Sequence, residues 1–148
     1  TSSLMGAIIG NADQSGIEAI SEYSENIGLA FQIQDDLLDV IADEGEFGKK
    51  IGGDILERKK TFLYLKALEI LDGSKKDEFL YLYNTAGEPD EKIKKVVNIY
   101  NDICVVESAR KEIEEYTGKA NRTLQGLPGD NASKLLLSFS DMLLNRSY

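Results

Sequence analysis

The sequence predicts an all-α protein, a helical bundle of about seven helices, and three observations lead to this fold class. Apolar residues recur every three or four positions along most of the chain, whereas the alternating runs that indicate strands are few. Only two prolines, the strongest helix breakers, occur in 148 residues. Hydrophobic residues make up 42% of the chain, which at this length is enough for one core. We therefore expect residues 1–148 to form a single all-helical domain.

Capping and turn residues divide the chain into elements. Ser15 follows a turn rich in Gly, Asp and Asn, and we expect it to cap a long helix with Glu18 as its capping-box partner. After a loop rich in Gly and Lys, Thr61 is expected to cap the next helix and Gly73 to end it. The expected helices cover residues 4–9, 16–42, 61–72, 74–85, 90–101, 103–124 and 131–146, with one helical turn near residues 55–58.

The composition excludes several classes of function. A net charge of −9 argues against a nucleic-acid partner, because few groups could neutralise a phosphate backbone. Without histidine, a Ser-His-Asp or Cys-His mechanism is impossible within this chain. The single cysteine, Cys104, excludes an internal disulfide, and its apolar neighbours predict a buried, inert thiol. The sequence has no transmembrane segment and no signal-peptide pattern, so we expect a cytoplasmic protein.

The helix expected over residues 27–41 carries a narrow polar stripe. Gln32, Asp35, Asp36 and Asp39 stand at positions i, i+3, i+4 and i+7, within an arc of about 100°. We call these four residues the acidic stripe. Such stripes usually face water, but here almost all of the remaining circumference is apolar, which is wider than a surface helix needs. This pattern favours a helix buried on nearly all sides, with the acidic stripe facing an internal cavity.

Carboxylates crowded on a desolvated stripe indicate a bound cation. Asp35, Asp36 and Asp39 would repel one another, and burial would make each charge costlier unless a cation lay between them. An all-oxygen site with few ligands suits Mg²⁺, which completes its shell with water and substrate phosphates. A calcium EF-hand is excluded because Leu37 and Ile41 fall where oxygen ligands are required. Zinc is disfavoured because histidine and a cysteine cluster are both missing.

A glycine-rich, basic segment follows the acidic stripe. Residues 48–61, GKKIGGDILERKKT, are called the basic loop here. Their glycines permit tight turns close to a ligand, and the ammonium groups of Lys49 and Lys59 are suitable partners for phosphate oxygens. Taken alone, loop lysines are more often solvated. Beside a carboxylate cluster of the metal-binding type, we favour diphosphate binding for this pair.

At these two segments the sequence resembles the trans-isoprenyl diphosphate synthases, the polyprenyl synthetase family. Residues 31–39, FQIQDDLLD, are similar to the family's second aspartate-rich motif, and the basic loop is similar to the segment that follows it. The first aspartate-rich motif, its arginines and the basic residues that hold isopentenyl diphosphate have no counterpart here. The resemblance therefore implies the C-terminal half of the isoprenoid synthase fold, in a chain that begins mid-domain.

The resemblance also implies an activity for the intact parent protein. A homodimer would use Mg²⁺ to join isopentenyl diphosphate to an allylic diphosphate, whose ionisation gives the attacked cation. The 148-residue chain alone, without the first motif, is expected to be inactive. The implied roles are Mg²⁺ binding for Asp35, Asp36 and Asp39, binding of the allylic diphosphate for Lys49 and Lys59, and stabilisation of the cation for Gln32 and Thr1.

Two other functions fit the same helices less well. A non-catalytic regulatory subunit of a heteromeric prenyltransferase is expected to lose acids or lysines from these motifs, and every position of the second motif is present here. A related terpene cyclase is disfavoured by the basic loop. The resemblance implies that product chain length depends on residues beside the first motif, which has no counterpart here.

Overall fold

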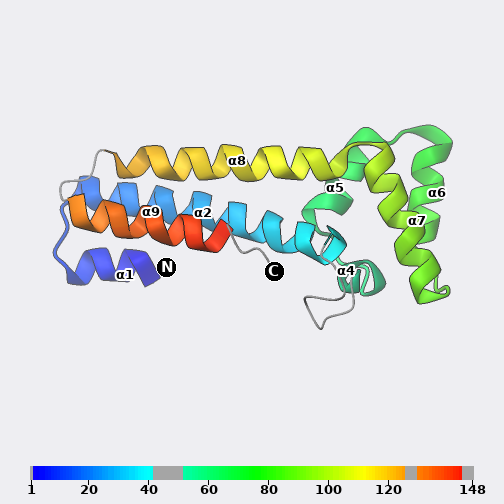
Figure 1. The fold of residues 1–148 in the computed structure, drawn as a ribbon, viewed down its shortest axis with the longest axis horizontal. Coiled ribbons are helices and arrows are strands. Elements are labelled where there is room, and N and C mark those ends of the chain that lie inside the picture. The colour runs from blue at the N-terminus through cyan, green and yellow to red at the C-terminus, as the bar shows by residue number, and fades with distance from the viewer. Residues whose placement is uncertain (1, 42–51, 126–129, 145–148) are drawn as a thin grey trace. The chain divides into compact units, whose positions relative to one another are not determined.

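The computed structural model describes residues 2–41, 52–125 and 130–144, and every regular element in these ranges is a helix. The all-α prediction is therefore confirmed (Figure 1). No helix in these ranges is both long and apolar enough to cross a membrane. The helices are α1 (Ser2–Ile9), α2 (Gln14–Ile41), α4 (Gly53–Leu56), α5 (Phe62–Ile70), α6 (Gly73–Asn84), α7 (Pro89–Asp102), α8 (Val105–Leu124) and α9 (Asp130–Leu144).

Tertiary contacts divide the chain into two compact units. Of the described residues, those between 2 and 32 and between 112 and 144 form the first unit, and those between 33 and 111 form the second. Helices α2 and α8 contribute residues to both units. Each unit is described by itself below.

The first unit packs α9 onto one end of α2 and of α8. Tyr23 and Ile27 of α2 form a buried cluster with Ala120 and Leu124 of α8, and four leucines of α9 pack against it. Tyr23 as a whole residue is 1% exposed. Its hydroxyl donates a hydrogen bond to the Leu136 carbonyl at 2.8 Å. A buried hydroxyl needs such a partner, so this bond fixes α9 against α2. The leucines of α9 in this cluster are Leu136, Leu137, Leu143 and Leu144.

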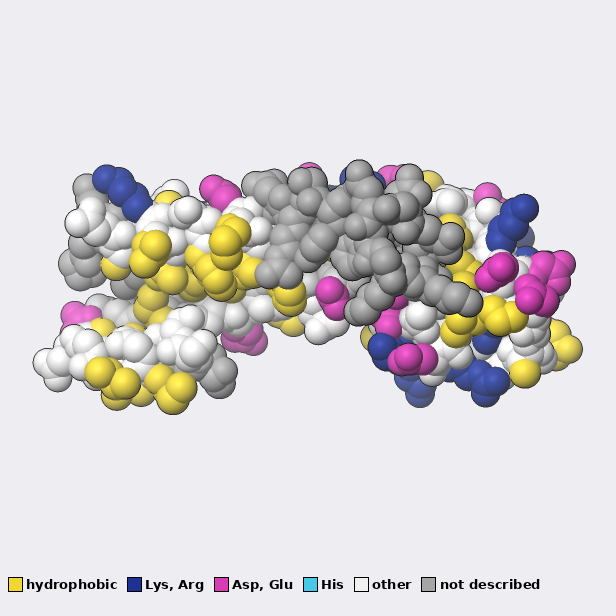
Figure 2. All heavy atoms as spheres, turned by 60° about the horizontal axis from the view of Figure 1, so that its bottom comes forward, with side chains coloured by type: hydrophobic (Ala, Val, Ile, Leu, Met, Phe, Trp, Pro, Cys, Tyr) yellow, Lys and Arg dark blue, Asp and Glu magenta, His cyan; other side chains and the backbone are white. Residues whose placement is uncertain are grey.

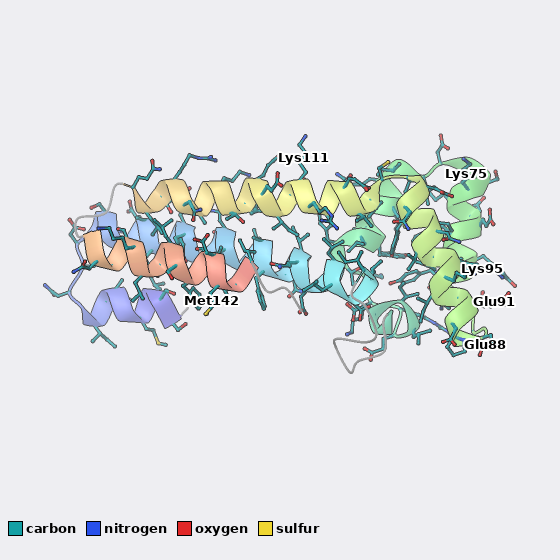
Figure 3. All side chains as sticks on the ribbon, in the orientation of Figure 1. Lys75, Glu88, Glu91, Lys95, Lys111 and Met142 are labelled. Carbon is teal, nitrogen blue, oxygen red and sulfur yellow. The ribbon has the colours of Figure 1, made fainter. Side chains whose placement is uncertain are left out.

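The second unit is built on an aromatic core. The rings of Tyr64, Phe79 and Tyr83 lie with their centroids 4.5–5.7 Å apart, and Tyr100 lies 6.0 Å from Phe79. These residues come from α5, α6 and α7, so the cluster joins three helices. Tilted rings at these separations attract one another in addition to burying apolar area. On the outside, charged side chains such as Lys95 and Glu91, an ion pair at 3.5 Å, project from α7 (Figure 3).

The cap of α2 differs from the prediction, whereas the cap of α5 is confirmed. The carboxylate of Asp13, and not the hydroxyl of Ser15, accepts the hydrogen bond from the Gly16 amide at 2.9 Å, and α2 begins at Gln14. Both residues are good caps, and the nearby Glu18 favoured Ser15 in the sequence. Thr61 caps α5 by accepting from the Tyr64 amide at 3.4 Å.

The remaining helix boundaries lie close to the predictions, except at Gly73, and the predicted burial of Cys104 also needs correction. Gly73 was expected to end a helix, but α5 ends at Ile70 and Gly73 is the first residue of α6. Cys104 was expected to be buried, but it is exposed. Its φ of 55° lies in the left-handed region, so the chain turns between α7 and α8. This turn removes Cys104 from the helical pattern on which the prediction of burial depended.

Candidate functional site

The acidic stripe lies along the second half of α2, and its members differ in burial. Gln32 and Asp35 are exposed, Asp39 is half-buried, and Asp36 is 7% exposed. The apolar face of the helix is covered less completely than predicted, because Leu29 and Ile41 are 42% and 40% exposed. The described part of the chain alone therefore does not cover this helix on nearly all sides, and the cavity expected in front of the acidic stripe stays a prediction.

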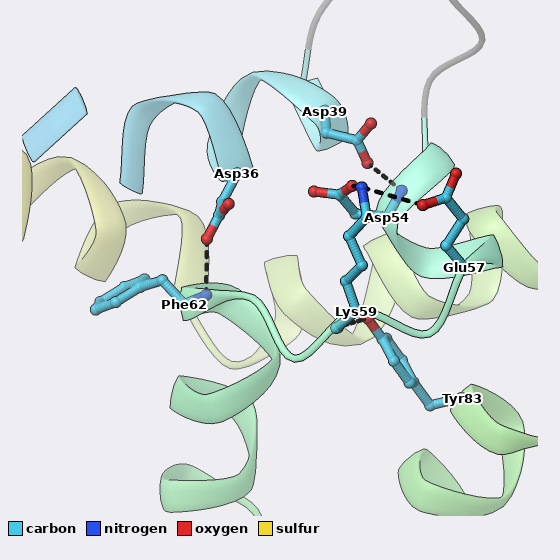
Figure 4. A network of polar contacts seen from close by, with 7 residues as sticks. All are labelled: Asp36, Asp39, Asp54, Glu57, Lys59, Phe62 and Tyr83. Carbon is cyan, nitrogen blue, oxygen red and sulfur yellow. Dashed lines mark hydrogen bonds and ion pairs between the residues drawn. The ribbon is translucent and has the colours of Figure 1, made fainter. Parts of the chain in front are cut away.

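Asp36 makes a structural contact with the following helix. Its Oδ2 accepts a hydrogen bond from the backbone amide of Phe62, the first residue of α5, at 2.9 Å (Figure 4). The first amides of a helix have no partner inside the helix, and a negative charge at this end is favourable. Asp36 and the neighbouring Thr61 thus both satisfy amides at the start of α5.

Asp39 is bound to the described part of the basic loop, residues 52–61. Its Oδ2 accepts from the Asp54 amide at 2.9 Å, and its carbonyl accepts from the Gly52 amide at 2.7 Å. Burial, as the largest cause, raises the pKa of the Asp39 carboxyl, while the bond from the Asp54 amide partly opposes that rise. The stripe and the loop are therefore held together by backbone bonds at the start of α4.

Lys59 faces the same place from the other end of the loop. Its Nζ lies 2.6 Å from Oδ1 of Asp54 and 3.1 Å from a carboxylate oxygen of Glu57. The hydrogen bond with Asp54 is the largest cause that raises the pKa of Lys59, so the side chain stays charged. With 54% of this side chain exposed, the ion pairs are solvated and the ammonium remains accessible to an anion.

Two residues outside the predicted set complete the arrangement. Asp54 links the pieces, because its amide binds Asp39 while its carboxylate binds Lys59. Tyr83 of α6 donates its hydroxyl to the Lys59 carbonyl at 2.6 Å. Asp54 belongs to the basic loop, so its position was visible in the sequence although its role was not. Tyr83 had no such signal, because an aromatic residue at helical spacing indicates a core.

The structure brings together only part of the predicted site. Asp35, Asp36, Asp39 and Lys59 lie in the second unit, and Gln32 lies on α2 one turn before Asp35. Lys49 and Thr1, predicted for diphosphate and cation binding, lie outside the described residues. An open groove in the first unit, lined by residues of α1, α2 and α9, includes no residue of the acidic stripe. The predicted cavity in front of the stripe is therefore not represented by that groove.

The carboxylates of the acidic stripe are ligands of the chemical type that Mg²⁺ prefers. Asp35 and Asp39 are four residues apart on one helix, and carboxylate oxygens are the hard ligands that Mg²⁺ prefers. Within the described ranges, no group of three or more acidic, histidine or cysteine side chains is arranged to hold a metal ion. Mg²⁺ in proteins usually has only one or two carboxylate ligands, and water and phosphate oxygens complete its shell.

Known proteins of one family are similar to this chain. The family model described as polyprenyl synthetase matches residues 1–100. A short chain isoprenyl diphosphate synthase of Methanothermobacter thermautotrophicus is 36% identical over 144 residues, which is 97% of this chain and 43% of the relative. A geranylfarnesyl diphosphate synthase of Natronomonas pharaonis is 33% identical over 144 residues, 96% of this chain and 40% of the relative.

Solved structures are similar over nearly the whole chain. The crystal structure of a geranylgeranyl pyrophosphate synthetase from Pyrococcus horikoshii has a TM-score of 0.88 at 31% identity, covering 97% of this chain and 43% of that one. A Corynebacterium glutamicum geranylgeranyl pyrophosphate synthase, complexed with isoprenyl diphosphate and magnesium, has a TM-score of 0.81 at 27% identity, covering 95% and 40%. The chain spans less than half the length of each of these four proteins.

Proposed function

The chain belongs to the polyprenyl synthetase family, and from this premise we propose that it supplies the diphosphate-binding part of a prenyltransferase. The reaction proposed is the condensation of isopentenyl diphosphate with an allylic diphosphate. Because the chain matches only 43% of the Methanothermobacter relative, the activity is proposed for a protein that also contains the rest of the fold.

One observation carries this proposal. The backbone amide of Asp54 binds the Asp39 carboxylate, and the Asp54 side chain binds Lys59 (Figure 4). A carboxylate of the metal-binding type and a loop ammonium are therefore held at one place, as simultaneous recognition of a metal and a phosphate requires. A solvated acidic surface would not need these backbone bonds.

The residues of this chain would act mainly on the leaving group. Asp35 and Asp39 would hold Mg²⁺, together with Asp36 if its carboxylate can serve both the metal and the Phe62 amide. Mg²⁺, when bound, would neutralise charge on the diphosphate. The Lys59 ammonium would leave Asp54 for a phosphate oxygen, which favours departure of the diphosphate with the electron pair of the allylic C–O bond.

The rest of the proposal is supported by the family resemblance alone. The isopentenyl double bond would attack the allylic cation, and a proton would then leave to the released diphosphate. The Gln32 amide oxygen and the Thr1 hydroxyl would stabilise the cation, and Lys49 would bind the diphosphate beside Lys59. A homodimer located in the cytoplasm is proposed on the same ground.

A chimera tests the proposal. In it, this sequence replaces the matching 144 residues of the Methanothermobacter relative, and circular dichroism verifies that the protein is folded. We expect transfer of labelled isopentenyl diphosphate onto geranyl diphosphate, dependent on added Mg²⁺. A folded chimera without transfer would contradict the proposal and would favour the non-catalytic regulatory subunit.

A further inference from the structure

Tyr83 occupies a buried position beneath Lys59. The residue is 1% exposed, and its hydroxyl donates to the backbone carbonyl of Lys59 at 2.6 Å. Burial, as the largest cause, raises the pKa of Tyr83, so the phenol stays neutral and keeps the proton that it donates. The two residues are 24 positions apart and come from different elements.

The direction of the Tyr83 hydroxyl is restricted by the packing of its ring against two aromatic neighbours. The ring centroid lies 4.5 Å from that of Tyr64 and 5.6 Å from that of Phe79. The Tyr83 carbonyl accepts a hydrogen bond at 2.7 Å from the ammonium of Lys92, a side chain that is itself almost fully buried. A second bond from Lys92 reaches the Thr85 carbonyl at 3.1 Å, so the end of α6 is anchored as well.

The segment that Tyr83 contacts has a constrained backbone. Arg58, just before Lys59, has a φ of 58°, in the left-handed region that a non-glycine residue rarely adopts. The Lys59 amide donates to the Asp54 carbonyl at 3.0 Å, and its carbonyl accepts from Tyr83. Both backbone polar groups of Lys59 are therefore hydrogen-bonded, and its side chain extends to the carboxylate of Asp54, whose amide binds Asp39 of the acidic stripe.

We propose that Tyr83 is a positioning residue for diphosphate binding, which acts by fixing the backbone from which Lys59 reaches the phosphate. This inference rests on the proposed role of Lys59. Without the hydroxyl, the Lys59 carbonyl would turn to solvent, and the ammonium would sample more directions. The cost would appear in the binding of the anion more than in the stability of the core.

The test is a titration of the 148-residue chain with inorganic diphosphate in the presence of Mg²⁺, followed by NMR. Tyr83→Phe removes one hydroxyl and keeps the ring, so we expect affinity to fall about three- to tenfold, the range for one lost hydrogen bond. Tyr81→Phe is the matched control, because Tyr81 lies on the same helix and is 72% exposed. This control should bind like the parent chain.

A double substitution separates positioning from a merely structural effect. If Tyr83 acts through Lys59, Tyr83→Phe should cause no further loss of affinity once Lys59→Ala is present. Unchanged affinity in Tyr83→Phe, with a large loss in Lys59→Ala, would overturn this inference and leave the proposed function in place. Equal losses from Tyr83→Phe with and without the Lys59 side chain would also overturn it. If Lys59→Ala binds like the parent, the proposed function fails and this inference fails with it.

Discussion

The Asp36 carboxylate and the Phe62 amide are joined by a hydrogen bond of 2.9 Å. One residue belongs to the acidic stripe, and the other begins the helix that follows the basic loop. The bond therefore connects the two segments on which the proposed site depends. Because Asp36 is 7% exposed, the bond lies in surroundings where loss of the acceptor would leave a poorly solvated amide.

Substitutions at Asp36 should separate its hydrogen bond from its charge. We expect Asp36→Ala to lower the free energy of unfolding by about 1–3 kcal/mol, because the Phe62 amide loses its partner. Asp36→Asn should cost less than about 1 kcal/mol, because an amide oxygen can accept the same bond. Urea unfolding of the 148-residue chain measures both. Equal losses for the two variants would show that the hydrogen bond is not the important contribution.

Substitution of Asp35 should affect turnover and not stability, because this residue is exposed at the site proposed for the metal. In the chimera, we expect Asp35→Ala to lower turnover by orders of magnitude and to leave the melting temperature nearly unchanged. Glu25→Ala is the control, an exposed acid on the same helix outside the stripe. Kinetics at increasing Mg²⁺ concentrations provide the measurement. A near-parental rate with the parental magnesium dependence would exclude Asp35 as a metal ligand.

Lys59 should distinguish between the two substrates. We expect Lys59→Ala in the chimera to raise KM for the allylic diphosphate more than KM for isopentenyl diphosphate. A lost charge-assisted contact should cost about 1.5–3 kcal/mol. Lys60→Ala, an exposed neighbour, is the matched control. The same substitution at Lys49 is predicted to act similarly, although that residue lies outside the described ranges. Equal effects on both KM values would mean that Lys59 does not define the allylic site.

Gly52 should be the least replaceable glycine of the described part of the loop. Its φ is 76°, and a Cβ there would lie 2.7 Å from the Ile93 side chain. We expect Gly52→Ala to destabilise the chain by about 1–3 kcal/mol through strain and overlap. Gly28→Ala is the control, because a Cβ at that exposed helical position meets nothing within 4 Å. Urea unfolding should show that this control is as stable as the parent or more stable by about 0.5–1 kcal/mol.

The features that the sequence predicted correctly depend on neighbouring residues. Thr61 caps the helix that directly follows it. The helix expected from residue 90 begins one residue earlier, at Pro89, where the missing amide costs nothing. The spacing of the stripe placed Asp35 and Asp36 on one face, but it did not predict that only Asp36 would be buried. That difference arises because Asp36 reaches the start of α5, which is 26 positions away.

The contacts that the sequence did not predict join residues far apart in the chain. The bond from Tyr83 to Lys59 depends on how α6 packs against α5, and no local pattern encodes it.

The choice between Asp13 and Ser15 as the cap of α2 was local but ambiguous, because both residue types cap helices well. The predicted burial of Cys104 was wrong because it was inferred from the apolar neighbours of this residue. The positive φ of Cys104 belongs to the turn, which those neighbours do not indicate.

The 148-residue chain alone should associate with itself and should not transfer prenyl groups. Large apolar side chains are exposed on both α1 and α9 of the first unit (Figure 2), and other residues of these helices line an open groove of about 850 Å³. Single apolar residues are common on surfaces, but several large ones exposed on two helices of one unit indicate an interface. The exposed residues are Met5, Ile8, Ile9, Leu135, Phe139 and Met142.

Light scattering should give a mass of at least twice 16.4 kDa. Ile9→Lys combined with Leu135→Lys should lower that mass, because these apolar side chains of α1 and α9 are 86% and 72% exposed. Leu65→Lys, at a 50% exposed position on α5, should leave it unchanged. A monomeric parent chain would show that the exposed side chains of α1 and α9 do not drive association. An assay with geranyl and isopentenyl diphosphates should give no product, since only one acidic motif is present. Robust turnover by this chain would mean that one motif is sufficient for the reaction, contrary to the division of roles proposed above.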